Sequence, residues 1–197
     1  MISVRESFVK QWESCYLNLT RPDISFKINM LSRLTPGENQ KDKVKQAREL
    51  IAEVKKTKVE IKYGTLGSLA SLYLEVHADA SFGNVEDKTR STEVAVIILR
   101  GSEGTGSPIY WRSKVIARVC KSAKSAETCA LEDAIDSAIN IGRQVHQLRT
   151  GRIEDKSCRI IAMTDSKGLV DSLNTTKQVS EGRMRLNVAR IKEYLDL

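Results

Sequence analysis

The sequence contains few of the residues that bind metals through nitrogen or sulfur. Among its 197 residues are two histidines, His77 and His146, and four cysteines, none of which forms a C-x-x-C pair. Structural zinc sites need histidines and cysteines at such close spacing. The sequence therefore gives no support to a zinc-binding domain.

Aromatic residues and long apolar runs are scarce as well. Phe, Trp and Tyr make up 5% of the chain, so we expect no broad aromatic surface for base stacking. No apolar run reaches the length of a membrane span, and the first residues, MISVRESF, lack the apolar segment of a signal peptide. We therefore expect an intracellular protein, in the cytoplasm or nucleus, with reduced thiols and no membrane contact.

Apolar and basic residues, by contrast, are plentiful. A hydrophobic content of 41% with only 3 prolines predicts a folded chain with a sizeable core. The net charge of +7 suits a polyanionic partner such as nucleic acid. Residues 111–126 contain no acid, and they either contact phosphates or belong to a mixed, solvated surface. The basic residues of this stretch are Arg112, Lys114, Arg118, Lys121 and Lys124.

The first third of the chain has a helical pattern. Residues 1–34 predict helices, and residues 40–57 place apolar side chains at i, i+3 and i+4, which is typical of an amphipathic helix. VEIKYG, residues 59–64, predicts a short strand that is followed by a Gly-rich turn. We therefore expect a helical segment over residues 1–66 and a second domain over residues 67–197.

The second domain has the pattern of an α/β fold. SLYLEVHADAS alternates apolar and polar residues, as a strand with one buried face does, whereas STEVAVIILRG is apolar nearly throughout. The order of elements predicts a mixed sheet, in which three antiparallel strands are joined through a long helix to a parallel fourth strand. The predicted strands are 71–81, 91–101, 108–119 and 157–166, and the predicted helices are 124–149, 167–174 and 181–197.

Three acids come together in this predicted sheet. Asp79 and Asp165 end two strands that should be adjacent and parallel, and Glu127 lies on the helix stripe that should face the sheet. Acids in such positions are costly unless they are paired or bind a cation. Carboxylate oxygens suit Mg²⁺ or Mn²⁺, which can promote hydrolysis of a phosphodiester. A helix-start or loop acid is the plain alternative for each residue alone.

Several motifs resemble the ribonuclease H region of copia-type retrotransposon polyproteins. HADASFGN, SAETCAL and TDSKGLVDSL are similar to its first three acidic motifs. Upstream, LTRPDISFKINMLSR and KVKQARELIAEVKKTKVEIKYG are similar to the segments between the polymerase palm and ribonuclease H. The resemblance is collinear and covers nearly the whole chain.

The resemblance implies a ribonuclease H-like fold that hydrolyses the RNA strand of RNA–DNA hybrids with Mg²⁺ or Mn²⁺. Asp79, Glu127 and Asp165 would be the metal ligands, and Ser81 and Asn84 would lie near the hybrid. The basic residues at 112–124 would contact phosphates. His77, Tyr110, Trp111, Arg183 and Arg185 are further candidates for contacts, with core packing or solvation as the alternative for each.

The sequence departs from this family in two respects. It contains no adjacent aspartates and hence no Tyr-x-Asp-Asp polymerase motif, so no DNA synthesis is expected. In the family, a further strand and a helix with a fourth catalytic aspartate follow, whereas this chain stops at Leu197. We therefore expect a C-terminally truncated domain with weak or lost activity, in which neither Asp171 nor Asp196 replaces the fourth acid.

Two other functions stay open at this point. The chain could be a catalytically inactive nucleic-acid-binding or structural derivative of the same fold. Alternatively, it could be a protein-interaction module, in which a partner strand or a second copy of the chain covers an open sheet edge.

Overall fold

The computed structural model describes residues 17–32, 40–84, 90–153, 158–175, 179 and 181–195. The chain forms two compact units, residues 1–61 and residues 62–197. The helix predicted over the first 16 residues and Asp196 lie outside the described residues. The functions assigned to the predicted domains, 1–66 and 67–197, stay predictions.

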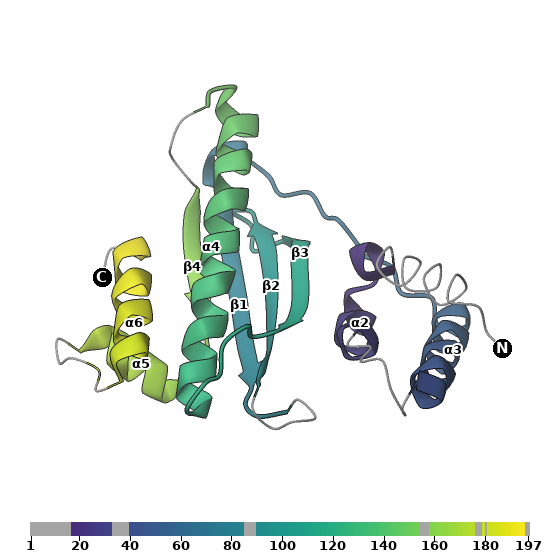
Figure 1. Cartoon of the computed structure of the whole chain (residues 1–197). Helices are drawn as coiled ribbons and strands as arrows, with labels where there is room; N and C mark the ends of the chain where they lie inside the picture. Colours follow the sequence, from purple (N-terminus) through teal and green to yellow (C-terminus); the bar gives the residue numbers. More distant parts are fainter. Residues whose placement is uncertain are drawn as a thin grey trace. The chain divides into compact units, whose positions relative to one another are not determined.

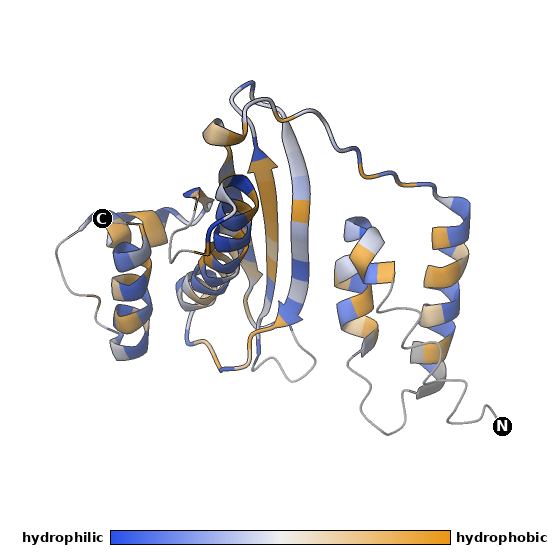
Figure 2. Cartoon of the chain, turned by 90° about the horizontal axis from the view of Figure 1, so that it is seen from above, coloured by the Kyte–Doolittle hydropathy of each residue, from blue (hydrophilic) through white to orange (hydrophobic). Residues whose placement is uncertain are grey.

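The first unit is a small helical assembly. A short 3₁₀ helix, η1 (Pro22–Ile24), leads into α2 (Ser25–Ser32), and α3 (Gln40–Lys56) confirms the predicted amphipathic helix. Hydrophobic and hydrophilic bands alternate along α3 in Figure 2. The buried core of this unit consists of Ile24, Ile28 and Leu50. Arg21 joins the two ends of this unit, because its guanidinium donates to the Asp23 carboxylate (2.9 Å) and to the Thr57 carbonyl (3.0 Å).

The strand predicted at residues 59–64 is wrong. Residues 57–68 form neither helix nor strand, and Val59 and Tyr63 are exposed. A strand needs a neighbour for its backbone groups, and these residues pair with none of the four strands of the sheet described below. The end of this segment instead lies against the β2–β3 connection: Thr105 donates to the Thr65 carbonyl (2.9 Å), and a side chain at Gly101 would collide with the backbone of Leu66.

The second unit contains the predicted mixed sheet. Its strands are β1 (Tyr73–Ser81), β2 (Thr92–Arg100), β3 (Gly106–Val115) and β4 (Arg159–Met163). They lie in the order β3-β2-β1-β4, with β1 antiparallel to β2, β2 antiparallel to β3, and β1 parallel to β4 (Figure 1). The expectation of three antiparallel strands and one parallel strand is confirmed.

Helices cover one face of this sheet. The long helix α4 (Ala123–Thr150) packs on β1 and β2, with the short 3₁₀ helix η2 (Leu69–Ser71) preceding β1. The alternation in β1 is confirmed, because Leu74, Val76 and Ala78 are buried and the residues between them are not. Small side chains on the inner stripe of α4 allow close approach to the strands. The core residues shared by β1, β2 and α4 are Leu74, Val76, Ala78, Ala95, Ile97, Ala130, Leu131, Ala134, Ile135 and Ala138.

Two further helices complete this layer. The described elements end with α5 (Lys167–Asn174) and α6 (Gly182–Tyr194). Leu169 of α5 and Ile191 of α6 are fully buried and extend the same core. In the described part of the chain, every helix is too short or too polar to cross a lipid bilayer.

Candidate metal centre

The register of the sheet brings Asp79 and Asp165 level with each other. β4 runs parallel to β1, and its last residue, Met163, lies opposite His77. Each aspartate comes two residues later in its own segment, Asp79 still within β1 and Asp165 just past β4. Their neighbourhood follows directly from the parallel pairing that the sequence predicted.

The start of α4 supplies the third acid. The Ser122 hydroxyl caps this helix by accepting the Ser125 N–H (3.1 Å), and Glu127 follows about one turn later. Ala126 and Ala130, fully buried against the sheet side, hold this stretch of helix close to the strands. α4 begins at the same end of the sheet at which β1 and β4 finish (Figure 1).

The three acids form one cluster. One carboxylate oxygen from each of Asp79, Glu127 and Asp165 lies within 4.8 Å of the other two. Burial, together with the charges of Asp79 and Asp165, raises the pKa of Glu127 to about 7, although a hydrogen bond from the Ala80 N–H acts in the opposite direction. The cluster therefore carries a concentration of negative charge that a cation would relieve.

The cluster fits a divalent cation that prefers oxygen ligands. Oε2 of Glu127 is buried and has no hydrogen-bond partner among the described residues. Oxygens on opposite sides of a bound Mg²⁺ lie about 4.2 Å apart, so small side-chain rotations would bring these three onto one ion. Mn²⁺ accepts the same oxygen ligands.

A second acid on β1 is kept out of this cluster. Glu75 accepts hydrogen bonds from Arg100 (2.8 Å) and pairs with His77 (2.7 Å). Arg100, and then His77, hold the pKa of Glu75 below its usual range. His77 thus lies between a paired carboxylate and a metal-ligand candidate. The ion pair between Arg100 and Glu75 was not predicted, because the two residues lie on neighbouring strands and come together only in the register of β1 and β2.

The turn after β1 is held by side chains from the start of β2. Gly83 adopts φ 61°, and its N–H donates to the Ser91 hydroxyl (3.1 Å). The Thr92 hydroxyl donates to the Asn84 amide oxygen (2.8 Å). Asn84 therefore shapes the turn in addition to its predicted place near a hybrid, and Ser81 is exposed beside it.

Two of the predicted phosphate contacts neutralise a buried acid. Glu93 of β2 is 1% exposed, and it pairs with Arg112 (2.9 Å) and Lys114 (3.2 Å) of β3. Lys114 also pairs with Asp133 of α4 (2.6 Å). Burial, and then the charge of Asp133, raise the pKa of Glu93 to about 7. A lone acid inside the apolar run STEVAVIILRG was the sequence signal for this network.

Arg118 is also engaged within the protein. Its Nε donates to the Cys129 sulfur (3.1 Å), and a terminal nitrogen lies 3.6 Å from Glu132. It lines a cavity of about 700 Å³ between residues 114–118, α4 and α6, together with Arg183. Arg118 and Arg183 thus come together, although they lie far apart in the sequence.

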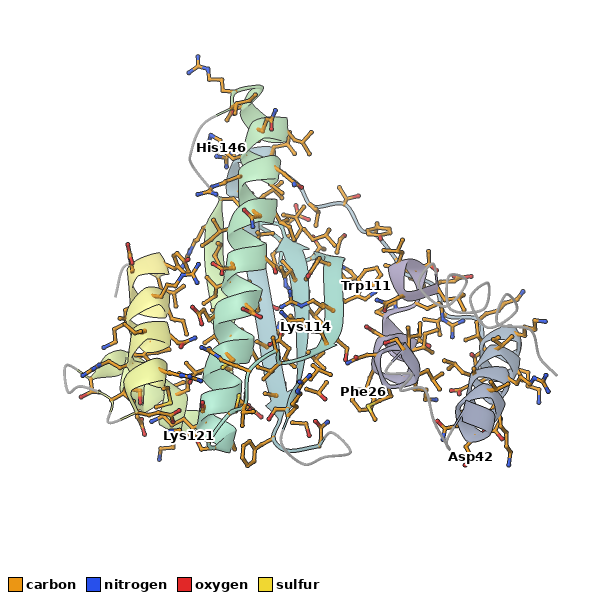
Figure 3. The ribbon with its side chains drawn as sticks, in the orientation of Figure 1. Phe26, Asp42, Trp111, Lys114, Lys121 and His146 are labelled. Carbon is orange, nitrogen blue, oxygen red and sulfur yellow. The ribbon has the colours of Figure 1, made fainter. Side chains whose placement is uncertain are left out.

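Lys121 and Lys124 are the predicted basic contacts with the freest charges. Figure 3 shows Lys114 beside α4 and Lys121 near the first turn of that helix. Lys121 is exposed and Lys124 half-buried, and neither forms an ion pair with a described residue. The aliphatic part of the Lys124 side chain lies against Gly168 at the start of α5. A Cβ atom added at Gly168 would be 3.6 Å from Cδ of Lys124. Both lysines come shortly before Glu127 in the sequence, Lys121 just before α4 and Lys124 in its first turn.

Comparison with known proteins gives one sequence relative. No protein-family model matches the chain. Over 119 residues, the chain is 33% identical to a protein of Saccharomyces cerevisiae described as a transposon Ty5-1 protein. The matched part is 60% of this chain and 35% of the yeast protein, so the chain spans about a third of that relative. The predicted resemblance to a transposon-encoded protein is confirmed, and the copia-type assignment stays a prediction.

Solved structures that are similar to the chain include ribonucleases H and a reverse transcriptase. Ribonuclease H1 of the archaeon Halobacterium salinarum matches with a TM-score of 0.43 and 16% identity, over 63% of this chain and 77% of that one. The ribonuclease H domain of prototype foamy virus matches with a TM-score of 0.36 and 15% identity, over 64% and 72%. The protease–reverse transcriptase of the same virus matches with a TM-score of 0.35 and 15% identity, over 64% and 16%.

Proposed function

We propose that the chain is the ribonuclease H-like part of a copia-type retrotransposon polyprotein, and that it hydrolyses the RNA strand of RNA–DNA hybrids. The observation that carries this proposal is the cluster of Asp79, Glu127 and Asp165, whose carboxylate oxygens lie within 4.8 Å of one another. The similarity to a transposon protein supports the retrotransposon origin in this proposal.

The three carboxylates would hold Mg²⁺ or Mn²⁺. When bound, such an ion supplies an activated water and stabilises the charge that develops on the phosphate. The protein provides the geometry: β1 and β4 fix the two aspartates, and the cap of α4 fixes the turn that carries Glu127. Because these elements are already packed, little reorganisation is needed when substrate arrives.

The surface around the cluster would position the hybrid. Lys121 and Lys124 would neutralise phosphates next to the acids. Arg118 would contact a phosphate at the cavity that it lines together with Arg183. Arg112 and Lys114 contribute less to this binding in our proposal, because their charges are offset by Glu93 and Asp133. Ser81 and Asn84 would face the minor groove, where 2′-hydroxyls distinguish RNA from DNA.

The test is cleavage of a hybrid whose RNA strand is labelled, in Mg²⁺ and in Mn²⁺, with Asp79→Asn as the comparison. We expect RNA cleavage that falls at least about 100-fold in the variant, because loss of one group that helps to stabilise transition-state charge typically lowers the rate by about 100- to 1,000-fold. Salt-sensitive hybrid binding without cleavage in both proteins would contradict hydrolysis, and would favour the nucleic-acid-binding alternative.

We also propose that a partner strand binds at the edge of the sheet that β4 forms. Within the described part of the chain, β4 pairs with β1 alone and is the last strand of the sheet. A partner strand or a second copy of the chain would satisfy its remaining backbone groups. Light scattering across a range of protein concentrations tests self-association at this edge.

A further inference from the structure

Phe82 is a half-exposed aromatic residue that lies close in the sequence to an acid of the candidate metal centre. It follows Asp79 by three residues, at the point where β1 turns towards β2, and it is 47% exposed. Half-exposing a phenylalanine forfeits part of the free energy that its burial would give. An isolated exposed side chain is ordinary, so the backbone beneath it decides whether this one is significant.

The turn that carries Phe82 is anchored on buried residues. The Ser91 hydroxyl accepts the Gly83 N–H, and Thr92 donates to Asn84, so both neighbours on the C-terminal side of Phe82 are tied to β2. Ser91 and Thr92 are each only 1% exposed. A side chain on an anchored turn loses less conformational freedom on binding than one on a loose loop.

We propose that Phe82 packs its ring against a nucleotide of the bound hybrid, beside the phosphate that lies at the carboxylates. Three residues span at most about 11 Å of chain, which is roughly three base-pair steps of 3.4 Å. The separation between Asp79 and Phe82 is therefore one that a nucleic-acid strand with a phosphate at the carboxylates spans in about three nucleotides. Apolar side chains such as phenylalanine make contacts of this kind in the minor groove.

A neutral ring suits this position for an electrostatic reason. A lysine or arginine in place of Phe82 would add another positive charge near Asp79. Phe82 adds contact area without adding charge. It thus complements the lysines at the start of α4, which we assigned to phosphates.

The test compares hybrid affinities, and it rests on the proposed function. In a Glu127→Gln background, used to prevent cleavage, Phe82→Ala should weaken hybrid binding by roughly 5- to 100-fold, the range for loss of one aromatic–base contact. Phe82→Tyr should bind within about twofold of the protein that keeps Phe82, because the tyrosine ring makes the same aromatic contact. The matched control is Leu148→Ala, which removes an 86% exposed side chain from the far end of α4 and should change nothing.

Two further readouts separate a contact from a structural role. The slope of log Kd against log salt should be the same with and without the Phe82→Ala substitution, because no phosphate contact is lost. With Glu127 intact, Mn²⁺ affinity should be unchanged by Phe82→Ala. Equal hybrid affinity with and without the ring would overturn the contact and leave hybrid binding standing. Absence of hybrid binding in the Glu127→Gln protein with Phe82 intact would overturn the contact together with the proposed function.

Discussion

At the candidate centre, the fold raises the pKa of the Glu127 carboxyl group. Its pKa of about 7 lies above the ordinary value of 4.5, so the folded chain binds this proton more tightly than the unfolded chain does. Without divalent ions, this residue should therefore lower the free energy of unfolding as pH rises from about 4.5 to about 7, and then have a constant effect. Urea unfolding in EDTA at pH 5, 6 and 8 measures this dependence.

Glu127→Gln isolates the contribution of this residue. The variant should gain stability relative to the parent protein as pH rises, because it lacks the carboxyl that becomes costly to ionise. Glu93 titrates in the same range, but it is present in both proteins and cancels in the difference. A stability difference between the two proteins that is constant from pH 5 to pH 8 would contradict the raised pKa.

At the scale of elements, one acid joins α4 to α6. Glu132 is 7% exposed and accepts hydrogen bonds from Asn187 and Arg190 of α6, while Asp136 pairs with the same Arg190 nearer the surface. Removing one partner from a buried ionic network leaves charged groups unsatisfied. Glu132→Ala should therefore lower the free energy of unfolding by about 3 kcal/mol.

Asp136→Ala is the matched control for this network. Its ion pair is half-exposed, so its loss should cost less than about 1 kcal/mol. Denaturant unfolding of both variants measures the two effects. Equal losses would mean that burial of Glu132 does not govern the contact between α4 and α6.

Elements and strand pairings with a signal in the sequence could be predicted, whereas most side-chain contacts between elements could not. The alternation in β1 and the stripe of α4 predicted which residues are buried, and the strand ends predicted the acid cluster. The strand predicted at residues 59–64 failed because β-like composition makes a strand only where another strand pairs with it, and none of the described strands does so. Arg112 and Lys114 looked like free charges, because the sequence shows a lone acid, Glu93, in an apolar strand but does not show the register that puts Lys114 opposite it.

At the scale of the whole molecule, all three candidate ligands belong to the second unit. Asp79, Glu127 and Asp165 come from three separated segments of residues 62–197, and only the parallel pairing of β1 with β4 and the packing of α4 unite them. The central claim is therefore that this fold makes one metal site from three distant acids. The sharpest evidence is metal binding itself, which is independent of any substrate.

We would measure Mn²⁺ binding by calorimetry for the parent protein and for Asp79→Asn, Glu127→Gln and Asp171→Asn. Asp171 is an exposed acid of α5 outside the cluster, so it controls for the loss of one negative charge. We predict that the parent protein and Asp171→Asn bind Mn²⁺ equally, and that each of the other variants binds at least about 10-fold more weakly. Undiminished binding by Glu127→Gln, or no binding by the parent protein, would contradict a metal centre at these three carboxylates.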